Sequence, residues 1–158
     1  MVLGCDPGLR VTGYAVLRAD DGRPAVVDMG VLTTQGRDLG ARLLQLYRDV
    51  EALLRDARPD VVVLEDLFAH ARFPRTAIVL GHARGVLCAV AAAAGVRTLA
   101  VAPAAVKQAV TGSGRASKPQ VQAALRRLLR LRALGNAHAA DALALAYTGL
   151  LRVGAVRG

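Results

Sequence analysis

The segment Asp60–Glu65, which reads Asp-Val-Val-Val-Leu-Glu, restricts the fold of this chain more than any other segment. Its four consecutive apolar residues, three of them β-branched, are typical of a strand at the centre of a sheet that is covered on both faces. It therefore predicts a layered fold in which helices lie on either side of a sheet.

Shorter signals along the chain supply the other elements of that sheet. Further strands are expected at Val2–Cys5, at Val11–Leu17, at Ala25–Thr34 with Gly30 as a bulge, and at Val96–Val101. Helices are expected from the cap at Asp38 to Pro59, from Pro74 to the cap at Gly95, from Pro103 to Lys107, from the cap at Ser117 through Arg130, and from the cap at Asn136 to Leu151. Since no linker or repeat divides the chain, we expect residues 1–158 to form a single α/β domain. Its five-stranded mixed sheet, three antiparallel strands followed by parallel ones, has helices on both faces.

The charge of the chain is distributed unevenly. The 158 residues carry a formal charge of +9, but residues 1–66 hold 8 basic and 11 acidic side chains, whereas residues 67–158 hold 13 basic and 1 acidic. The half from about residue 67 onward therefore predicts a positive face, for which nucleic acid is the commonest polyanionic partner. A solvated basic surface without a partner is the alternative.

Lysine is rare among these basic side chains. Of 21 Lys and Arg residues only Lys107 and Lys118 are lysine, and both lie in the basic half. A compact ammonium group kept where arginine is otherwise used indicates a phosphate contact, although chance placement explains two residues equally well. Between them, Gly112–Arg115 is expected to be a flexible basic loop, with Arg115 as a further DNA contact.

Nothing in the sequence predicts export or membrane insertion. No basic segment precedes the first strand, and the longest uncharged apolar run, Gly85–Val96, has 12 residues, too few to cross a bilayer. Cys5 and Cys88 lie in apolar runs and are expected to pack as small apolar side chains in a reducing compartment. We expect a cytoplasmic protein.

Three carboxylates occupy positions that are unusual for charged groups. Asp6 ends the first expected strand, Glu65 ends the fourth, and Asp141, the single acid after residue 66, lies in a run of alanine and leucine. If the first and fourth strands are parallel neighbours, Asp6 and Glu65 meet at the sheet edge where α/β folds bind ligands. Carboxylates held this close need a cation, and a set of oxygen ligands suits Mg²⁺ or Mn²⁺.

His138 precedes Asp141 by three residues, so both side chains lie on one face of the last helix. Together Asp6, Glu65, His138 and Asp141 can hold two divalent cations about 4 Å apart, the arrangement for attack of water on a phosphodiester. Three of the four residues also have a simpler explanation: Asp6 as part of a turn, Glu65 as a solvated strand end, and His138 as a surface or capping residue. The metal hypothesis depends on the four residues lying together.

The loop after the fourth strand combines the only phenylalanines of the chain with arginines. The loop and the start of the next helix carry Phe68, Arg72, Phe73 and Arg75. Aromatic rings beside guanidinium groups can stack on unpaired bases or insert into a strained duplex, whereas the alternative is that the rings anchor the loop. On the following helix, Gly81 and Gly85 permit close approach, either of a second copy of the chain or of the rest of the monomer.

Six segments occur in an order and at a spacing that match a known family. They are Leu3–Tyr14, Glu65–Phe68, Leu80–Val86, Val106–Gly112, Ser117–Lys118 and Ala140–Ala144, and they extend over nearly the whole chain. Together they resemble the motifs of the RuvC-type Holliday-junction resolvases. The resemblance implies a ribonuclease-H-like fold and a homodimer in which each subunit cuts one strand of a four-way DNA junction at symmetric positions. It also implies a role in homologous recombination and DNA repair, beside a branch-migration motor formed by RuvA and RuvB.

The resemblance also implies roles for single residues. By the match to these motifs, the metal-binding catalytic acids are Asp6, Glu65 and Asp141, the base-stacking aromatic is Phe68, and the phosphate contacts are Lys107 and Lys118. One position departs from the pattern, because the family often has aspartate where this chain has His138. Imidazole is a softer and neutral ligand, so we expect the second metal to bind more weakly and to favour Mn²⁺ over Mg²⁺.

Two other functions fit parts of the sequence. A glycine-rich turn with an aspartate after the first strand also opens actin-like sugar kinases, but those enzymes need two such domains to enclose a nucleotide, and this sequence carries one and no further phosphate loop. A catalytically weak or inactive junction-binding protein on the same fold would tolerate loss of the acids, which are all present. The sequence therefore favours a metal-dependent junction endonuclease.

Overall fold

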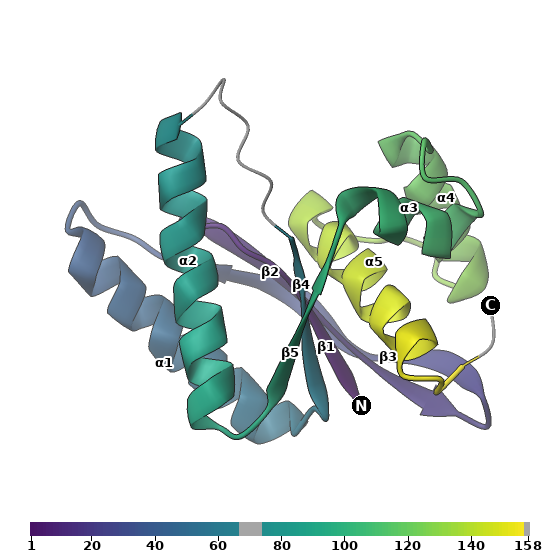
Figure 1. The fold of residues 1–158 in the computed structure, drawn as a ribbon, viewed down its shortest axis with the longest axis horizontal. Coiled ribbons are helices and arrows are strands. Elements are labelled where there is room, and N and C mark those ends of the chain that lie inside the picture. Colours follow the sequence, from purple (N-terminus) through teal and green to yellow (C-terminus); the bar gives the residue numbers. More distant parts are fainter. Residues whose placement is uncertain (67–73, 157–158) are drawn as a thin grey trace.

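The fold is a five-stranded sheet with helices on both faces (Figure 1). The computed structural model describes residues 1–66 and 74–156, with side chains from residue 77 onward in the second range. The strands are β1 (Val2–Asp6), β2 (Val11–Asp20), β3 (Arg23–Thr33), β4 (Val61–Glu65) and β5 (Arg97–Val101). The helices are α1 (Leu39–Ala57), α2 (Pro74–Ala93), α3 (Pro103–Thr111), α4 (Lys118–Leu128) and α5 (Ala137–Arg152).

The strands lie in the order β3-β2-β1-β4-β5, and the sheet is mixed, as the sequence predicts. β1 pairs antiparallel with β2 and parallel with β4, and β4 pairs parallel with β5. The carboxyl ends of the three parallel strands, at Asp6, Glu65 and Val101, therefore lie along one edge of the sheet, called here the C-terminal edge. This is the edge at which open α/β sheets bind their ligands.

The apolar run of β4 is buried because both faces of the sheet are covered. Val61 and Val63 belong to a core shared with α3, α4 and α5, whereas Val62 and Leu64 belong to a second core shared with α1 and α2. All four side chains are at most 2% exposed. Successive side chains of a strand point to opposite faces, so a strand between two helical layers has no position left for a polar residue until its end.

Glycines in the sheet let α5 pack against it closely. A side chain on Gly4 or Gly13 would place its Cβ under 3.0 Å from backbone atoms of α5, at Ala142 in the first case and at His138 in the second. Because the contact at Gly13 lies opposite Asp6 in the β1–β2 register, the first turn of α5 is set beside the end of β1.

One predicted detail of the sheet is wrong. The register of β2 and β3 shifts after Val16, which leaves Val27 of β3 as the extra residue of the bulge. Gly30 instead pairs regularly with Tyr14, and the ring and hydroxyl of this tyrosine lie 3.0–3.1 Å from where a Cβ of Gly30 would be. A strand glycine can therefore mark the close approach of a neighbouring ring rather than an irregular backbone.

Two helix ends also differ from the prediction. α3 continues past Lys107 to Thr111, and it ends at Gly112, whose φ of 79° is in the left-handed region that favours glycine. α4 ends at Leu128, so Arg130, with a φ of 53°, lies beyond the helix. None of the helices in the described part of the chain is long and apolar enough to cross a membrane.

Candidate active site

Asp6 and Glu65 lie at neighbouring positions on the C-terminal edge. β1 and β4 are parallel neighbours with Cys5 opposite Leu64, and each carboxylate is the last residue of its strand. The charge of Asp6 contributes to a raised pKa of Glu65, which reflects how close the two groups are. The predicted pairing of the first and fourth strands is therefore confirmed, and with it the juxtaposition of these carboxylates.

The first turns of α5 bring the other two candidate ligands to the same edge. Asn136 caps the helix, because its Oδ1 accepts a hydrogen bond from the backbone N–H of His138 at 2.8 Å. Nδ1 of His138 lies 2.7 Å from Oδ2 of Asp6. Asp141, one turn further along, raises the pKa values of Asp6 and Glu65 through its charge. The four residues thus lie together, although they come from three distant segments of the chain.

Lysines from α3 and α4 face these carboxylates across a small cavity of about 290 Å³. Lys118 Nζ donates a hydrogen bond to Oδ2 of Asp141 at 2.7 Å. Lys107 lines the same cavity as Glu65 and lowers its pKa slightly through its charge. The remaining walls are apolar side chains of α3, α4 and α5. The two lysines of the chain therefore stand at the candidate site, where the sequence suggested phosphate contacts.

Burial and mutual repulsion raise the pKa values of the carboxylates. Burial is the main reason that the pKa of Asp6 is raised, and the charge of Asp141 adds to it, whereas the hydrogen bond with His138 opposes it. Burial likewise raises the pKa of Glu65, and the two aspartates add to it. The pKa of Lys118 is raised chiefly by its hydrogen bond to Asp141. The cluster therefore carries negative charge at neutral pH at a cost that a cation can offset.

The chemistry of this donor set fits divalent cations, although its side chains already have partners. Within residues 1–66 and 74–156, no three His, Cys, Asp or Glu side chains are arranged to hold one metal ion. Instead Asp6 contacts His138, and Asp141 contacts Lys118. Carboxylates that raise one another's pKa are nonetheless the oxygen ligands that Mg²⁺ and Mn²⁺ prefer. Lys118 occupies Oδ2 of Asp141, so an ion that bound this oxygen would displace the ammonium group.

Two residues that sequence reasoning missed hold main-chain segments near the site through hydrogen bonds. Arg84 of α2 donates a hydrogen bond from Nε to the backbone oxygen of Glu65 at 3.3 Å. Gln108 of α3 donates to the backbone oxygen of Gly112 at 2.8 Å and accepts from the N–H of Gly114 at 2.9 Å. The loop expected to be flexible is therefore braced by a side chain. The one sequence signal for both residues is that they lie inside the family motifs.

The other predicted DNA contacts lie away from the carboxylates or outside the described residues. Arg115 is exposed and, with Arg127, lines a separate hollow of about 640 Å³. Phe68, Arg72 and Phe73 lie outside the described residues, as does the side chain of Arg75. Their contacts with DNA stay predictions.

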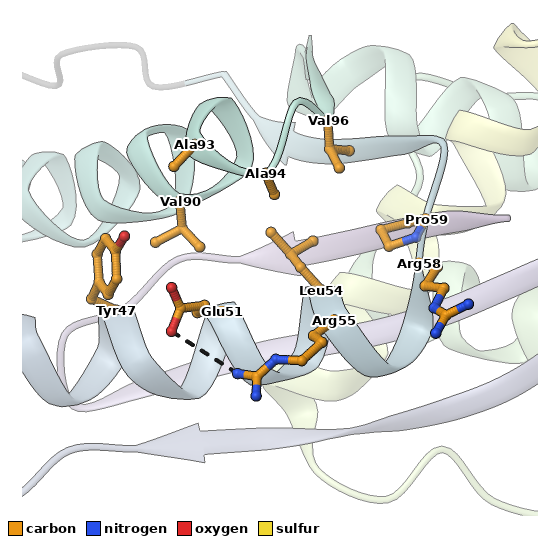
Figure 2. A pocket seen from close by; sticks show the side chains of 10 residues that line it. All are labelled: Tyr47, Glu51, Leu54, Arg55, Arg58, Pro59, Val90, Ala93, Ala94 and Val96. Atoms are coloured by element: carbon orange, nitrogen blue, oxygen red, sulfur yellow. Dashed lines mark ion pairs between the residues drawn. The ribbon is translucent and has the colours of Figure 1, made fainter.

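A larger cavity of about 720 Å³ lies between α1 and α2, away from the carboxylates (Figure 2). It is lined by apolar residues such as Leu54 and Val90, and Glu51 and Arg55 form an ion pair of 4.0 Å at its rim. Pro59, which also lines it, precedes β4, so this cavity is at the opposite edge of the sheet from Glu65. With a single carboxylate, it offers no cluster for metal-dependent chemistry.

The arrangement at the C-terminal edge can be compared with known proteins. The family model for crossover junction endodeoxyribonuclease RuvC matches residues 2–149, a range that includes Asp6, Glu65, His138 and Asp141. The chain belongs to the RuvC family. As a member of that family it is an endodeoxyribonuclease, and the sequence-based identification of the family is confirmed.

Relatives from several bacteria support this membership over nearly the whole chain. The RuvC of Halorhodospira halophila is 46% identical over 147 residues, which cover 92% of this chain and 86% of the relative. The RuvC of Rhodopirellula baltica is 41% identical over 150 residues, covering 94% and 84%. The RuvC of Ruminiclostridium cellulolyticum is 38% identical over 162 residues, covering 100% and 97%.

Solved structures agree in the fold. Thermus thermophilus RuvC superposes with a TM-score of 0.87 at 31% identity, covering 99% of this chain and 98% of that one. The same protein in complex with a Holliday junction substrate gives a TM-score of 0.88 at 31% identity, covering 99% and 97%. The ribonuclease-H-like fold expected from the sequence is therefore confirmed.

The raised pKa of Glu65 predicts that its ionised carboxylate lowers the free energy of unfolding at neutral pH. A carboxyl group whose pKa is higher in the folded state stabilises that state below its unfolded pKa, and this contribution is lost as the pH rises through the folded pKa. We therefore expect Glu65→Gln to raise the free energy of unfolding at pH 7, by the roughly 0.5–2 kcal/mol common for single stabilising substitutions. Thermal unfolding of both proteins without divalent ions measures this difference in stability.

The gain should disappear near pH 4, where Glu65 itself becomes protonated. Glu51→Gln is the control, because Glu51 is exposed and its ion pair with Arg55 is long. Equal unfolding temperatures for wild type and Glu65→Gln at pH 7 would mean that the carboxylate cluster imposes no such cost.

Proposed function

We propose that this member of the RuvC family resolves four-way DNA junctions by metal-dependent hydrolysis of phosphodiesters, in homologous recombination and DNA repair. The observation that carries the proposal is the convergence of Asp6, Glu65, His138 and Asp141 at one sheet edge, beside the two lysines of the chain. The family is one of metal-dependent nucleases. The Holliday junction in the T. thermophilus complex is the substrate that we carry over to this chain.

The catalytic steps can be assigned to residues at the C-terminal edge. Asp6, Glu65 and Asp141, with His138 as a nitrogen ligand, would hold two divalent cations. Such cations supply a more acidic water and stabilise the leaving 3′ oxygen. The side chain of His138 is oriented by its contact with Asp6, and the main chain of Glu65 is fixed by Arg84. Apolar side chains of α3, α4 and α5 line the cavity beside Glu65 and Asp141.

The lysines and the basic half of the chain would bind the DNA backbone. Lys118 donates its hydrogen bond to Oδ2 of Asp141, and its ammonium group would be available to a phosphate if that contact were released. Lys107 lies across the same cavity, and Arg115 extends the positive surface along the braced loop. Phe68 would stack on a base. Arg72, Phe73 and Arg75 would make further contacts with the DNA.

The rest of the proposal concerns assembly and setting. We place the protein in the cytoplasm as one nuclease domain over residues 1–158, acting as a homodimer beside the RuvA and RuvB motor. The outward side of α2 supports a dimer: Ile78 is 60% exposed and Val79 is 40% exposed. Among the described residues, nothing apart from the backbone of α2 itself and the adjacent residues lies within 4 Å of where a Cβ of Gly81 or Gly85 would be. A monomer by sedimentation at the concentration that cuts junctions would contradict the dimer.

A synthetic four-way junction with each strand labelled in turn tests the proposed activity. With low millimolar Mg²⁺ or Mn²⁺ we expect paired nicks at symmetric positions, and little cutting of a linear duplex of the same sequence. Because His138 is a softer ligand than aspartate, Mn²⁺ should support faster cutting than Mg²⁺ at equal concentration.

The outcomes of this assay separate the alternatives. Junction binding without cutting in either metal would favour the inactive binding protein over the resolvase. Equal rates in Mg²⁺ and Mn²⁺ would leave the resolvase intact and contradict only the metal preference assigned to His138.

The stacking role of Phe68 predicts a separate result. Stacking of one base on an aromatic ring contributes about 1–3 kcal/mol. If this stacking holds the strand for cutting, Phe68→Ala should cut junctions about 5- to 160-fold more slowly while most junction binding is kept. Phe73→Ala is the matched comparison. Unchanged cutting by Phe68→Ala would remove the stacking role.

A further inference from the structure

An open hollow of about 700 Å³ lies on the other flank of the carboxylates, in the half of the chain that is acidic overall. Its walls come from the turn between β1 and β2, the end of β3 and the second turn of α1. They are formed by Arg10, Val11, Thr33, Thr34, Gln35, Gly36 and Arg42. Two arginines, two threonines and a glutamine therefore line one space, and no acidic residue of the described part of the chain is among its lining residues.

Hydrogen bonds hold one of the two arginines in place. Arg42 donates from Nε to the hydroxyl of Thr34 at 3.0 Å and from a terminal nitrogen to the backbone oxygen of Leu9 at 3.1 Å. Thr34 is buried, its hydroxyl donates to the same oxygen of Leu9, and its N–H donates to the oxygen of Arg10 at 3.2 Å. Arg42 thus fixes the turn that carries Arg10, and the hollow is a preformed feature.

Arg10 itself is exposed and has no acidic partner in the described residues. Within residues 1–66 and 74–156, no ion pair joins Arg10 or Arg42 to an aspartate or glutamate. Other arginines of the same half do have such partners: Arg18 faces Asp20 at 3.5 Å. Two arginines that form no ion pair in the described residues, beside one polar hollow, are suited to bind an oxyanion. Of the two, Arg10 is the one whose guanidinium group donates no hydrogen bond within that part of the chain.

The hollow lies on the same sheet edge as the catalytic carboxylates. In the register of β1 and β2, Asp6 is opposite Gly13, and Val11 lies two residues further toward the C-terminal edge. Val11 is in turn opposite Thr33 of β3. Arg10 therefore stands beyond the start of β2, on the β3 side of Asp6. The lysine-lined cavity has its walls in α3, α4 and α5 instead. In Figure 1, α3 and α4 lie on the other side of the top of the sheet from the end of β3.

We propose that the hollow at Arg10 and Arg42 binds a backbone phosphate of the DNA, on the β3 side of the carboxylates. The inference rests on the proposed function and extends it, since the basic half alone was expected to contact DNA. The backbone would then be held on both flanks of the reacting phosphodiester, by Lys107 and Lys118 on one side and by Arg10 on the other. Arg42 is a positioning residue, because two of its donors are already used.

The test is the salt dependence of junction binding for Arg10→Gln, measured in EDTA so that no strand is cut. Each phosphate contact contributes about 0.9 to the slope of log K against log salt. We expect the slope of Arg10→Gln to fall by about that amount and its affinity at moderate salt to drop several-fold. Arg10→Lys, which keeps the charge, should retain most of the wild-type slope.

Arg18→Gln is the matched control. It also removes one exposed arginine, but Arg18 lies near the end of β2, whereas Arg10 lies just before its start. If Arg10→Gln and Arg18→Gln have equal slopes while wild type binds and cuts junctions, the hollow does not bind phosphate and the proposed function is unaffected. If wild type neither binds nor cuts junctions, the proposed function itself fails. Thermal unfolding of Arg10→Gln verifies that the fold is kept.

Discussion

An Asp141→Asn variant will bind four-way junctions at least as tightly as the wild type and will cut them more than about 100-fold more slowly. Removing groups that only support a metal ligand already costs about 10- to 100-fold in metal affinity or activity, and Asp141 would be a ligand itself. Binding should be kept or strengthened, because the ammonium group of Lys118 loses its carboxylate partner and is available to a phosphate. Gel-shift titration in EDTA and single-turnover cutting in Mn²⁺ measure the two effects separately.

Asp56→Asn is the control for this substitution. Asp56 is an exposed aspartate near the end of α1, and the change also removes one negative charge from the chain. It should leave both binding and cutting unchanged. If Asp141→Asn cuts at the rate of the control, Asp141 is not a metal ligand and its contact with Lys118 has another role.

The position of the carboxylates could be predicted from the sequence because it depends on local signals. Asp6 and Glu65 each end a short apolar strand, and the carboxyl ends of parallel strands meet at one edge. His138 and Asp141 follow from helical spacing once the cap at Asn136 is recognised. These steps require only the type and order of the helices and strands, which strong periodicity in the sequence predicts. They do not require the exact packing.

The partners of these side chains could not be predicted in the same way. The hydrogen bond of Lys118 to Asp141 joins residues 23 positions apart on different helices, and it depends on how α4 packs beside α5. The hydrogen bond of Arg84 to the main chain of Glu65 likewise depends on where α2 lies. Such contacts are set by tertiary packing, which a periodic pattern does not encode.

The net charge of each half of the chain predicted the average sign of its surface but not the charge of individual hollows within it. The excess of acids in residues 1–66 predicts no phosphate contact there, yet Arg10 and Arg42 share a hollow without acidic side chains. The acids of that half lie elsewhere, for example in the ion pair of Arg18 with Asp20. A sum over a segment cannot separate arginines that are paired from those that are not.

Gly13→Ala is expected to lower both stability and cutting, because the added methyl group has no space. A Cβ at this position would lie under 3.0 Å from the backbone oxygen and carbon of His138, which cannot move without shifting α5. Overpacking of a core commonly costs about 1–3 kcal/mol and sometimes more, and here the obstacle is backbone. We expect a loss of about 3 kcal/mol or more, or roughly 10 °C in Tm for a chain of this size.

Cutting should fall together with stability, because the same shift moves His138 and Asp141 away from Asp6. The comparison is Gly40→Ala in α1, where the nearest atom to a Cβ is Oδ1 of Asp38 at 3.4 Å, so its stability should stay within about 1 kcal/mol of wild type. Thermal unfolding of both variants, with junction cutting measured well below Tm, tests the argument. A Gly13→Ala variant with wild-type Tm would mean that α5 does not pack on β2 at this distance. Gly13 would then not be needed to place the first turn of α5 beside the end of β1.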